Sequence, residues 1–461
     1  MGSRGWLALL LLGGLAGFGV FAWQRAEGAA PRVEAPPEVV LGAAGGKTEL
    51  RLADPGSGLR EIEAALVHAR GESQLLRRDF PGSWLAGGPS REEHVTLEIA
   101  PPAQEVPDGS ALLRIAVRDW SWRMNQTALE IPVEIDRKPP RIAIRSGLTY
   151  VDRGGSGAVA YGVSEATARD GVEVGEEGQP GAAFYRGYPR AAEQARAAGD
   201  GGAAPAGDRI ALFAVGKGAP ARPRVQVVAV DRAGNTARAS WPLVLKEKPF
   251  PQGNVTLPEG FLESKAEPLA RAAGIPTQDL VESFRAVNTD LRRRNEERIR
   301  ELIAGGEPVA LFRGAFEQLK NSKVTSRFAE DRIYFVGGKR VSEATHYGYD
   351  LASTAGAPIT AANAGRVLHA GDLGIYGGCV ILDHGLGLSS LYGHLSQIDV
   401  AAGDRVEKGQ TLGRSGDTGL AGGDHLHFAL LLGETYVDPV EWWDPKWVAE
   451  HVEGALSGAP P

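Results

Sequence analysis

Six of the nine histidines in this 461-residue chain lie between residues 346 and 427. His425 and His427 stand two apart at the start of an apolar run, residues 424–432, that is typical of a strand. Because alternate side chains on a strand share a face, we expect both imidazoles to point into one cleft, with Leu426 turned into the core. The spacing therefore predicts a β-sheet that carries clustered imidazoles, and such a cluster indicates a metal or acid–base site.

A carboxylate stands close to another histidine of this cluster. Asp350 follows His346 by four residues, and His394 lies in a separate Tyr-Gly-His-Leu sequence. Two histidine nitrogens and one carboxylate with an open fourth position are typical of catalytic zinc, whereas closed structural zinc sites usually recruit cysteines. The chain has one cysteine, Cys379, which we expect to be a small buried side chain. A lone His-x-His pair is common without a metal, but these motifs together predict a metal site.

Three motifs occur in order along the chain, namely His346-Tyr-Gly-Tyr-Asp350, Tyr392-Gly-His-Leu395 and His425-Leu-His-Phe428. Through them, residues 322–443, about a quarter of the chain, resemble the lysostaphin-type (LytM-type) zinc endopeptidase domain. The resemblance implies an antiparallel β fold for this region. Two positions depart from the family pattern, since Ala329 stands where a glycine is common and Ala429 where a glutamate is common.

The resemblance implies a role for each residue of the cluster that matches it. His346, Asp350 and His427 would bind Zn²⁺, and His394 and His425 would be the catalytic pair beside the metal. One imidazole would accept a proton from water, and the other would polarise the carbonyl or protonate the leaving amine. Which of the two acts as the base stays open. The implied activity is hydrolysis of peptide bonds in bacterial peptidoglycan, and the bond that is cut stays open too.

A regulator is the main alternative to an enzyme. Members of this family that lost the zinc ligands activate cell-wall amidases by binding alone, but this chain keeps every ligand position. An envelope scaffold would explain residues 40–247 and leave the histidine cluster unexplained. The formal net charge of −7 argues against a nucleic-acid partner. His369 and His384 are expected to be structural, and whether residues 250–335 cover the cleft and keep the enzyme latent stays open.

The N-terminus predicts export of the chain. Nineteen uncharged residues run from Gly5 to Trp23 between Arg4 and Arg25, long enough to cross a bilayer as a helix. We expect residues 1–25 to be a transmembrane anchor, with a cleaved signal as the alternative. The expected location is the cytoplasmic membrane, in a single pass, with the bulk of the chain on the periplasmic or extracellular side.

The remaining chain is predicted to be multidomain and mainly β. Runs of alternating apolar and polar residues at 48–52, 94–99, 112–117 and 129–135 are typical of strands in an immunoglobulin-like β-sandwich. A weak internal sequence similarity predicts a second sandwich of the same kind. Residues 153–207, rich in Gly and Ala, are expected to be a poorly ordered insertion. Envelope proteins are possible partners of the sandwiches. The predicted parts are a tether at 26–39, a sandwich at 40–137, a second sandwich at 138–248, a helical connector at 249–320 with a helix capped by Thr277, a peptidase domain at 321–447 and a tail at 448–461.

Overall fold

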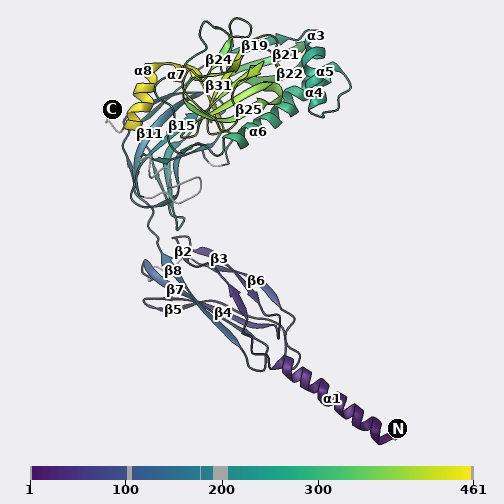
Figure 1. Ribbon diagram of the computed structural model, residues 1–461. Coiled ribbons are helices and arrows are strands. Elements are labelled where there is room, and N and C mark those ends of the chain that lie inside the picture. The colour runs from purple at the N-terminus through teal and green to yellow at the C-terminus, as the bar shows by residue number, and fades with distance from the viewer. Residues whose placement is uncertain (1–2, 101–105, 177, 191–205, 458–461) are drawn as a thin grey trace. The chain divides into compact units, whose positions relative to one another are not determined.

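The computed structural model describes residues 3–100, 106–176, 178–190 and 206–457 (Figure 1). Strands dominate these residues, which confirms the prediction of a mainly β chain. The chain divides into two compact units, Met1–Pro139 with Val230–Asn235, and Pro140–Ala229 with Thr236–Pro461. The largest hydrophobic cluster of each unit is built from that unit's own residues.

The first unit begins with helix α1, Ser3–Arg25. Its last residue contacts two loops between the strands that follow, because the Arg25 guanidinium donates to the carbonyls of Trp84 and Trp120. Over the part of the chain that the structure describes, no helix combines the length and the apolar character needed to cross a membrane. The anchor predicted for residues 1–25 is therefore not supported.

Two sheets form the sandwich of the first unit, in the strand orders β1-β3-β6 and β2-β8-β7-β4-β5. All four strands predicted from alternation are present. In β6, for example, Val95, Leu97 and Ile99 are buried while the residues between them are exposed, as expected for strands with one face on a core. The strands are β1 Arg32–Glu34, β2 Val39–Leu41, β3 Gly46–Ala53, β4 Leu59–His68, β5 Gly71–Asp79, β6 Glu92–Ile99, β7 Gly109–Asp119 and β8 Gln126–Ile135.

The poorly ordered insertion predicted for residues 153–207 is wrong wherever the structure describes this segment. Gly155–Val163 forms β11, a strand that is buried along its whole length, and further strands follow it. Small residues are required in β11, because a Cβ at Gly157 would lie 2.9 Å from the ring of Phe213. Close packing therefore explains the glycine at position 157. Residues 191–205 of the predicted insertion lie outside the described residues.

The second sandwich pairs the sheets β14-β15-β11-β9 and β13-β12-β16-β17, with a parallel pair β10-β18 beside them. Its strands are β9 Ile142–Ile144, β10 Thr149–Asp152, β11 Gly155–Val163, β12 Thr167–Val174, β13 Ala183–Arg186, β14 Tyr188–Pro189, β15 Gly207–Val215, β16 Val225–Asp231, β17 Thr236–Ala239 and β18 Leu243–Lys246.

The predicted helical connector is built into the peptidase region. It opens with a strand, β19 Gln252–Thr256, which pairs in parallel with β21. Helix α5 is capped by Asp279, whose side chain accepts from the Glu282 backbone N–H, and not by Thr277 as predicted. The later helices run along the sheet that holds β25 (Figure 1). The helices are α3 Glu259–Phe261, the π-helix η1 Leu262–Ala266, α4 Glu267–Ala272, α5 Leu280–Ala286, the π-helix η2 Val287–Leu291 and α6 Arg292–Ile303.

An eight-stranded sheet in the order β20-β23-β31-β27-β26-β25-β29, with β32 beside β31, carries four of the clustered histidines, His369, His384, His394 and His427. Two three-stranded sheets, β19-β21-β22 and β24-β30-β28, complete the region. The strands are β20 Lys323–Ser326, β21 Glu330–Val336, β22 Lys339–His346, β23 Tyr349–Ala352, β24 Pro358–Thr360, β25 Gly365–Asp372, β26 Gly378–Gly385, β27 Leu388–Leu395, β28 Gln397–Ile398, β29 Arg405–Val406, β30 Thr411–Arg414, β31 Leu426–Leu432 and β32 Thr435–Val437, with the 3-10 turn η3 at Gly374–Tyr376.

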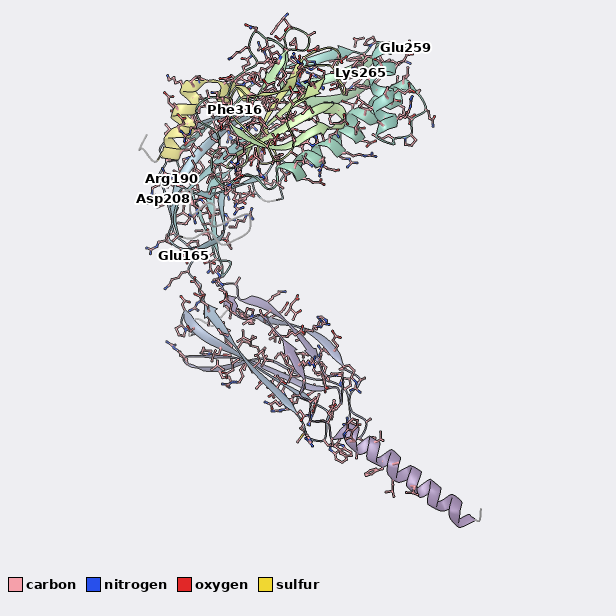
Figure 2. The ribbon with its side chains drawn as sticks, viewed as in Figure 1. Glu165, Arg190, Asp208, Glu259, Lys265 and Phe316 are labelled. Atoms are coloured by element: carbon pink, nitrogen blue, oxygen red, sulfur yellow. The ribbon has the colours of Figure 1, made fainter. Side chains whose placement is uncertain are left out.

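The second sandwich and this region share one hydrophobic cluster. Trp442 of α7 is fully buried, packs against Phe316 (Figure 2), and donates through its indole N–H to the Ser156 hydroxyl of β11 at 2.9 Å. The predicted C-terminal tail is helical up to residue 457, and its Val452 is buried in the same cluster. These helices are α7 Pro439–Trp443, α8 Pro445–Val448, the π-helix η4 Ala449–Glu453 and α9 Gly454–Ser457.

Candidate metal centre and the residues around it

Strand pairing brings the three predicted ligands together. His346 ends β22, and Asp350 on β23 lies directly opposite His427 on the neighbouring strand β31. The Nε2 atom of His346 lies 2.9 Å from Asp350 Oδ1 and 3.0 Å from His427 Nδ1, and the latter two atoms are 2.9 Å apart. Tetrahedral zinc, with bonds of about 2.0–2.1 Å, holds its ligand atoms roughly 3.3 Å apart. The donor triad therefore fits a small divalent cation with little movement.

The surroundings of His427 and Asp350 favour a neutral imidazole and an ionised carboxylate, the forms that bind metal. Burial lowers the pKa of His427 to about 4. Burial would raise the pKa of Asp350, but the charge of His346 and hydrogen bonds from the nearby histidines place it well below its ordinary value. The second nitrogen of His346, Nδ1, lies 3.2 Å from the Arg327 carbonyl, which holds Nε2 toward the triad.

Gly348 has a steric role beside His427. A Cβ at this position would lie 2.7 Å from the Nε2 atom of His427 and 2.8 Å from the Phe428 carbonyl oxygen. Only glycine therefore allows His427 to occupy its place next to Asp350. This contact gives a physical reason for the glycine between His346 and Asp350 in the motif.

His394 and His425 lie next to the triad and close to each other. Their ring centroids are 4.8 Å apart, and His425 Nε2 lies 3.6 Å from Asp350 Oδ1. The Nδ1 atom of His394 lies 2.8 Å from the Thr418 carbonyl, and that of His425 lies 2.8 Å from the Gly423 carbonyl. Each carbonyl accepts a hydrogen bond from the Nδ1–H group, so the Nε2 atom of each ring stays available for proton transfer.

The two rings differ in the pKa that their surroundings impose. Burial, together with the charges of His425 and His427, lowers the pKa of His394 to about 3. Burial also lowers the pKa of His425, but the hydrogen bond and the charge of Asp350 outweigh it, so that the net pKa is raised.

A family model described as peptidase family M23 matches residues 344–439, which include the triad and both further histidines. The chain contains an M23 peptidase domain. Peptidoglycan DD-endopeptidase ShyA of Vibrio cholerae is 36% identical over 110 residues, which are 24% of this chain and 25% of ShyA. DD-carboxypeptidase/endopeptidase Mpg of Neisseria meningitidis is 37% identical over 95 residues, which are 21% of this chain and 22% of Mpg.

These matches span about a quarter of the length of the curated relatives. Among solved structures, the catalytic domain of the antimicrobial peptidase lysostaphin from Staphylococcus simulans is 29% identical, covers 28% of this chain and 98% of its own, and has a TM-score of 0.24. The family model and the curated relatives confirm the sequence resemblance for the M23 domain at residues 344–439.

The two departures from the family pattern have structural reasons. Ala329 adopts φ = 59°, the left-handed conformation that glycine occupies most readily, so the backbone shape is kept although the residue differs. Ala429 is buried in a cluster that includes Val287 and Ile299 of the helical segment. An apolar side chain is needed there, because these helices cover the face of the sheet on which Ala429 lies.

The other members of the histidine cluster lie outside the triad. Both ring nitrogens of His384 are engaged at 2.7 Å, with the Ala364 carbonyl and the Ser390 hydroxyl, as expected for a structural residue. His369 lies on β25 and does not contact the triad residues through any described hydrogen bond. Cys379 is fully buried among apolar side chains, where burial raises the pKa of its thiol.

Among the contacts that upstream residues make with the M23 domain, two support the candidate site and were not predicted from the sequence. Arg332 on β21 donates to Asp350 Oδ2 at 3.1 Å, the oxygen that faces away from the two histidines. Lys265 of η1, marked in Figure 2, lies 3.1 Å from the Asp417 carboxylate and also donates to its carbonyl. Asp417 precedes Thr418, so Lys265 supports the loop whose carbonyl orients His394. Neither residue belongs to a motif that spacing alone could reveal.

A cavity of about 610 Å³ opens onto the triad. On one side it is lined by His394, His425 and the triad, and on the other by Leu257, Phe261 and Lys265 of the upstream segment. Its volume lies within the range of small-ligand sites, roughly 300–1,000 Å³. The helical segment thus forms one wall of the cleft above the candidate metal centre.

Proposed function

We propose that this chain is a zinc-dependent endopeptidase that hydrolyses peptide bonds in bacterial peptidoglycan. The observation that carries the proposal is the donor triad of His346, Asp350 and His427, with ligand atoms 2.9–3.0 Å apart and two further histidines beside it. The name of the relative ShyA, a peptidoglycan DD-endopeptidase, supports peptidoglycan as the substrate.

In this proposal the chain supplies the ligands and the proton transfer. His346, Asp350 and His427 would hold Zn²⁺, which when bound supplies a Lewis acid that makes water reactive near neutral pH. The Nε2 atoms of His394 and His425 would move the protons, one taking a proton from the attacking water and one donating to the leaving amine or polarising the carbonyl. Arg332 would hold Asp350 so that Oδ1 remains directed at the two histidine ligands.

A non-catalytic regulator of a cell-wall amidase is less well supported. A regulator that acts by binding alone needs no three donor atoms within metal-binding distance, and no fixed Nε2 pair beside them. A surface that binds an amidase would have to be exposed, whereas Asp350 is buried.

Substitution of single histidines in the complete chain separates these roles. We expect His427→Ala to lose both bound zinc and release of peptides from purified peptidoglycan. His394→Ala should retain stoichiometric zinc, measured by mass spectrometry of the metal, while the cleavage rate falls by roughly 10²–10⁴-fold. Loss of zinc from His394→Ala would contradict the division of roles between ligands and proton-transfer residues. Unchanged cleavage by both variants would contradict the proposed enzymatic activity.

The location of the chain is a separate proposal. We infer that the M23 domain acts outside the cytoplasmic membrane, because the proposed substrate lies there and the apolar N-terminal run is typical of exported proteins. Protease added to intact spheroplasts should then degrade residues 140–461. Protection of this region until the cells are lysed would contradict the location.

A further inference from the structure

The candidate metal centre lies between two cavities. One, of about 610 Å³, faces His394 and His425, and a larger one, of about 1150 Å³, extends toward the second sandwich. Besides the ligands His346 and His427, the residues that line both cavities include Arg292 and Tyr376. Arg292 is the first residue of α6 and lies outside the region matched by the M23 family model.

Arg292 differs from the other basic residues of the smaller cavity. Lys265 is paired with Asp417 at 3.1 Å, and Arg332 is paired with Asp350 at 3.1 Å. Of the carboxylates that the structure describes, none lies within ion-pair distance of Arg292, whose hydrogen bonds all go to Asn288. A guanidinium that is half-buried beside a metal centre is therefore left without an anion.

The natural helical partner of Arg292 is engaged elsewhere. Glu296 follows one turn later, at the spacing that usually allows an ion pair. Its Oε1 accepts from the Tyr376 hydroxyl at 2.7 Å, and its Oε2 accepts from the Tyr436 hydroxyl at 2.8 Å. Both oxygens of Glu296 are thus directed at tyrosines, and Arg292 stays available to a ligand.

Asn288 holds the guanidinium in place. Its Oδ1 accepts from Arg292 Nη2 at 2.9 Å, while its own amide donates to the Ser342 hydroxyl at 2.8 Å and to the Glu343 carbonyl. Arg292 is in this way fixed to β22, the strand that ends in His346. A guanidinium has five N–H groups and is always charged, so the groups not bonded to Asn288 remain for an anion.

We propose that Arg292 binds a carboxylate of the peptide substrate close to the bond that is cut. The inference rests on the proposed function and names its substrate class, an anionic stem peptide in preference to a neutral glycine bridge. Arginine binds carboxylates through two parallel hydrogen bonds. These bonds fix the orientation of the ligand and favour a negatively charged group over a neutral one. Arg292 would select substrate and place its scissile bond, without taking part in proton transfer.

The experiment compares two substrates and three variants of the complete chain. The substrates are purified cross-linked stem-peptide dimers with free carboxylates, and the same dimers with their carboxylates converted to amides. The variants are Arg292→Gln, Arg292→Lys, and Arg293→Gln as the matched control, since Arg293 is exposed on the same helix and pairs with Glu297. Zinc content and the unfolding temperature establish that each variant is folded.

We expect the wild type to prefer the free-carboxylate dimer, and Arg292→Gln to lower kcat/KM for that dimer by about 10- to 100-fold, mainly through KM. The same variant should barely change cleavage of the amidated dimer, Arg292→Lys should fall between, and Arg293→Gln should match the wild type. Equal loss on both dimers, or equal cleavage of both by the wild type, would overturn the inference.

Cleavage of neither dimer would count against the proposed function, and calorimetric binding of the same two dimers would then decide the role of Arg292. Tighter binding of the free-carboxylate dimer that Arg292→Gln abolishes would support the inference. Equal or absent binding of the two dimers would overturn it.

Discussion

Glu441 on α7, just after the residues matched by the M23 model, is a half-buried carboxyl group that contacts β11 of the second sandwich. Its Oε2 accepts from the Ser156 backbone N–H at 2.8 Å and from the Ser156 hydroxyl at 3.1 Å. Burial and the charges of nearby Asp438 and Asp152 outweigh the bonds to Ser156 and raise the pKa of Glu441 from 4.5 to about 8. At neutral pH this group therefore carries its proton in the folded protein.

The raised pKa makes stability depend on pH in a defined direction. Between about 4.5 and 8 the folded chain binds a proton at Glu441 that the unfolded chain has released, so stability falls as the pH rises. The loss begins near the unfolded pKa and is complete above the folded one. The gap between the two values corresponds to roughly 5 kcal/mol, as an order of magnitude.

The substitution Glu441→Gln tests this linkage. The amide oxygen of glutamine can still accept from Ser156, but the side chain no longer titrates. Urea unfolding from pH 5 to pH 9, followed by tryptophan fluorescence, should give similar stabilities at pH 5. Above pH 8 the variant should be more stable by several kcal/mol. Parallel pH profiles of the two proteins would refute the reasoning.

Three further predictions concern packing, backbone and metal. Trp442→Ala should lower the free energy of unfolding by about 3–5 kcal/mol in the same assay, because the side chain is fully buried. A Cβ at Gly377 would lie 2.4 Å from the Thr418 carbonyl carbon, so Gly377→Ala should disturb the carbonyl that orients His394 and lower the cleavage rate by roughly 10- to 100-fold with zinc retained. Gly403→Ala, at a positive φ with open space around it, is the matched control and should cleave normally. Chelation should abolish cleavage, and stoichiometric zinc should restore it.

The sequence could predict the metal-site candidates because their spacing determines their geometry. His425 and His427 lie two apart at the start of a strand, and Asp350 has a local motif with His346, so strand pairing needed only to bring two short segments together. The strands of the first sandwich were equally predictable, since apolar and polar residues alternate in them.

Contacts across the fold could not be predicted in this way. Gly157 and its neighbours looked like a flexible segment because composition does not reveal that Phe213 lies against them. No local motif marks Arg292, Lys265 or Arg332, because only the packing of the upstream helices and of β21 brings them to the candidate metal centre. Asp279 caps α5 in place of Thr277. The prediction missed the helix start by two residues, because local sequence signals do not define a helix boundary more closely than that.

The central claim is that the M23 domain cuts peptide bonds in peptidoglycan with a metal held by His346, Asp350 and His427. Digestion of purified peptidoglycan by the zinc-loaded complete chain, with mass analysis of the soluble products, tests it most directly. We predict fragments with new amino termini and intact glycan linkages, and none from Asp350→Ala. Release of no peptide by the zinc-loaded wild type, or equal release by Asp350→Ala, would contradict the account.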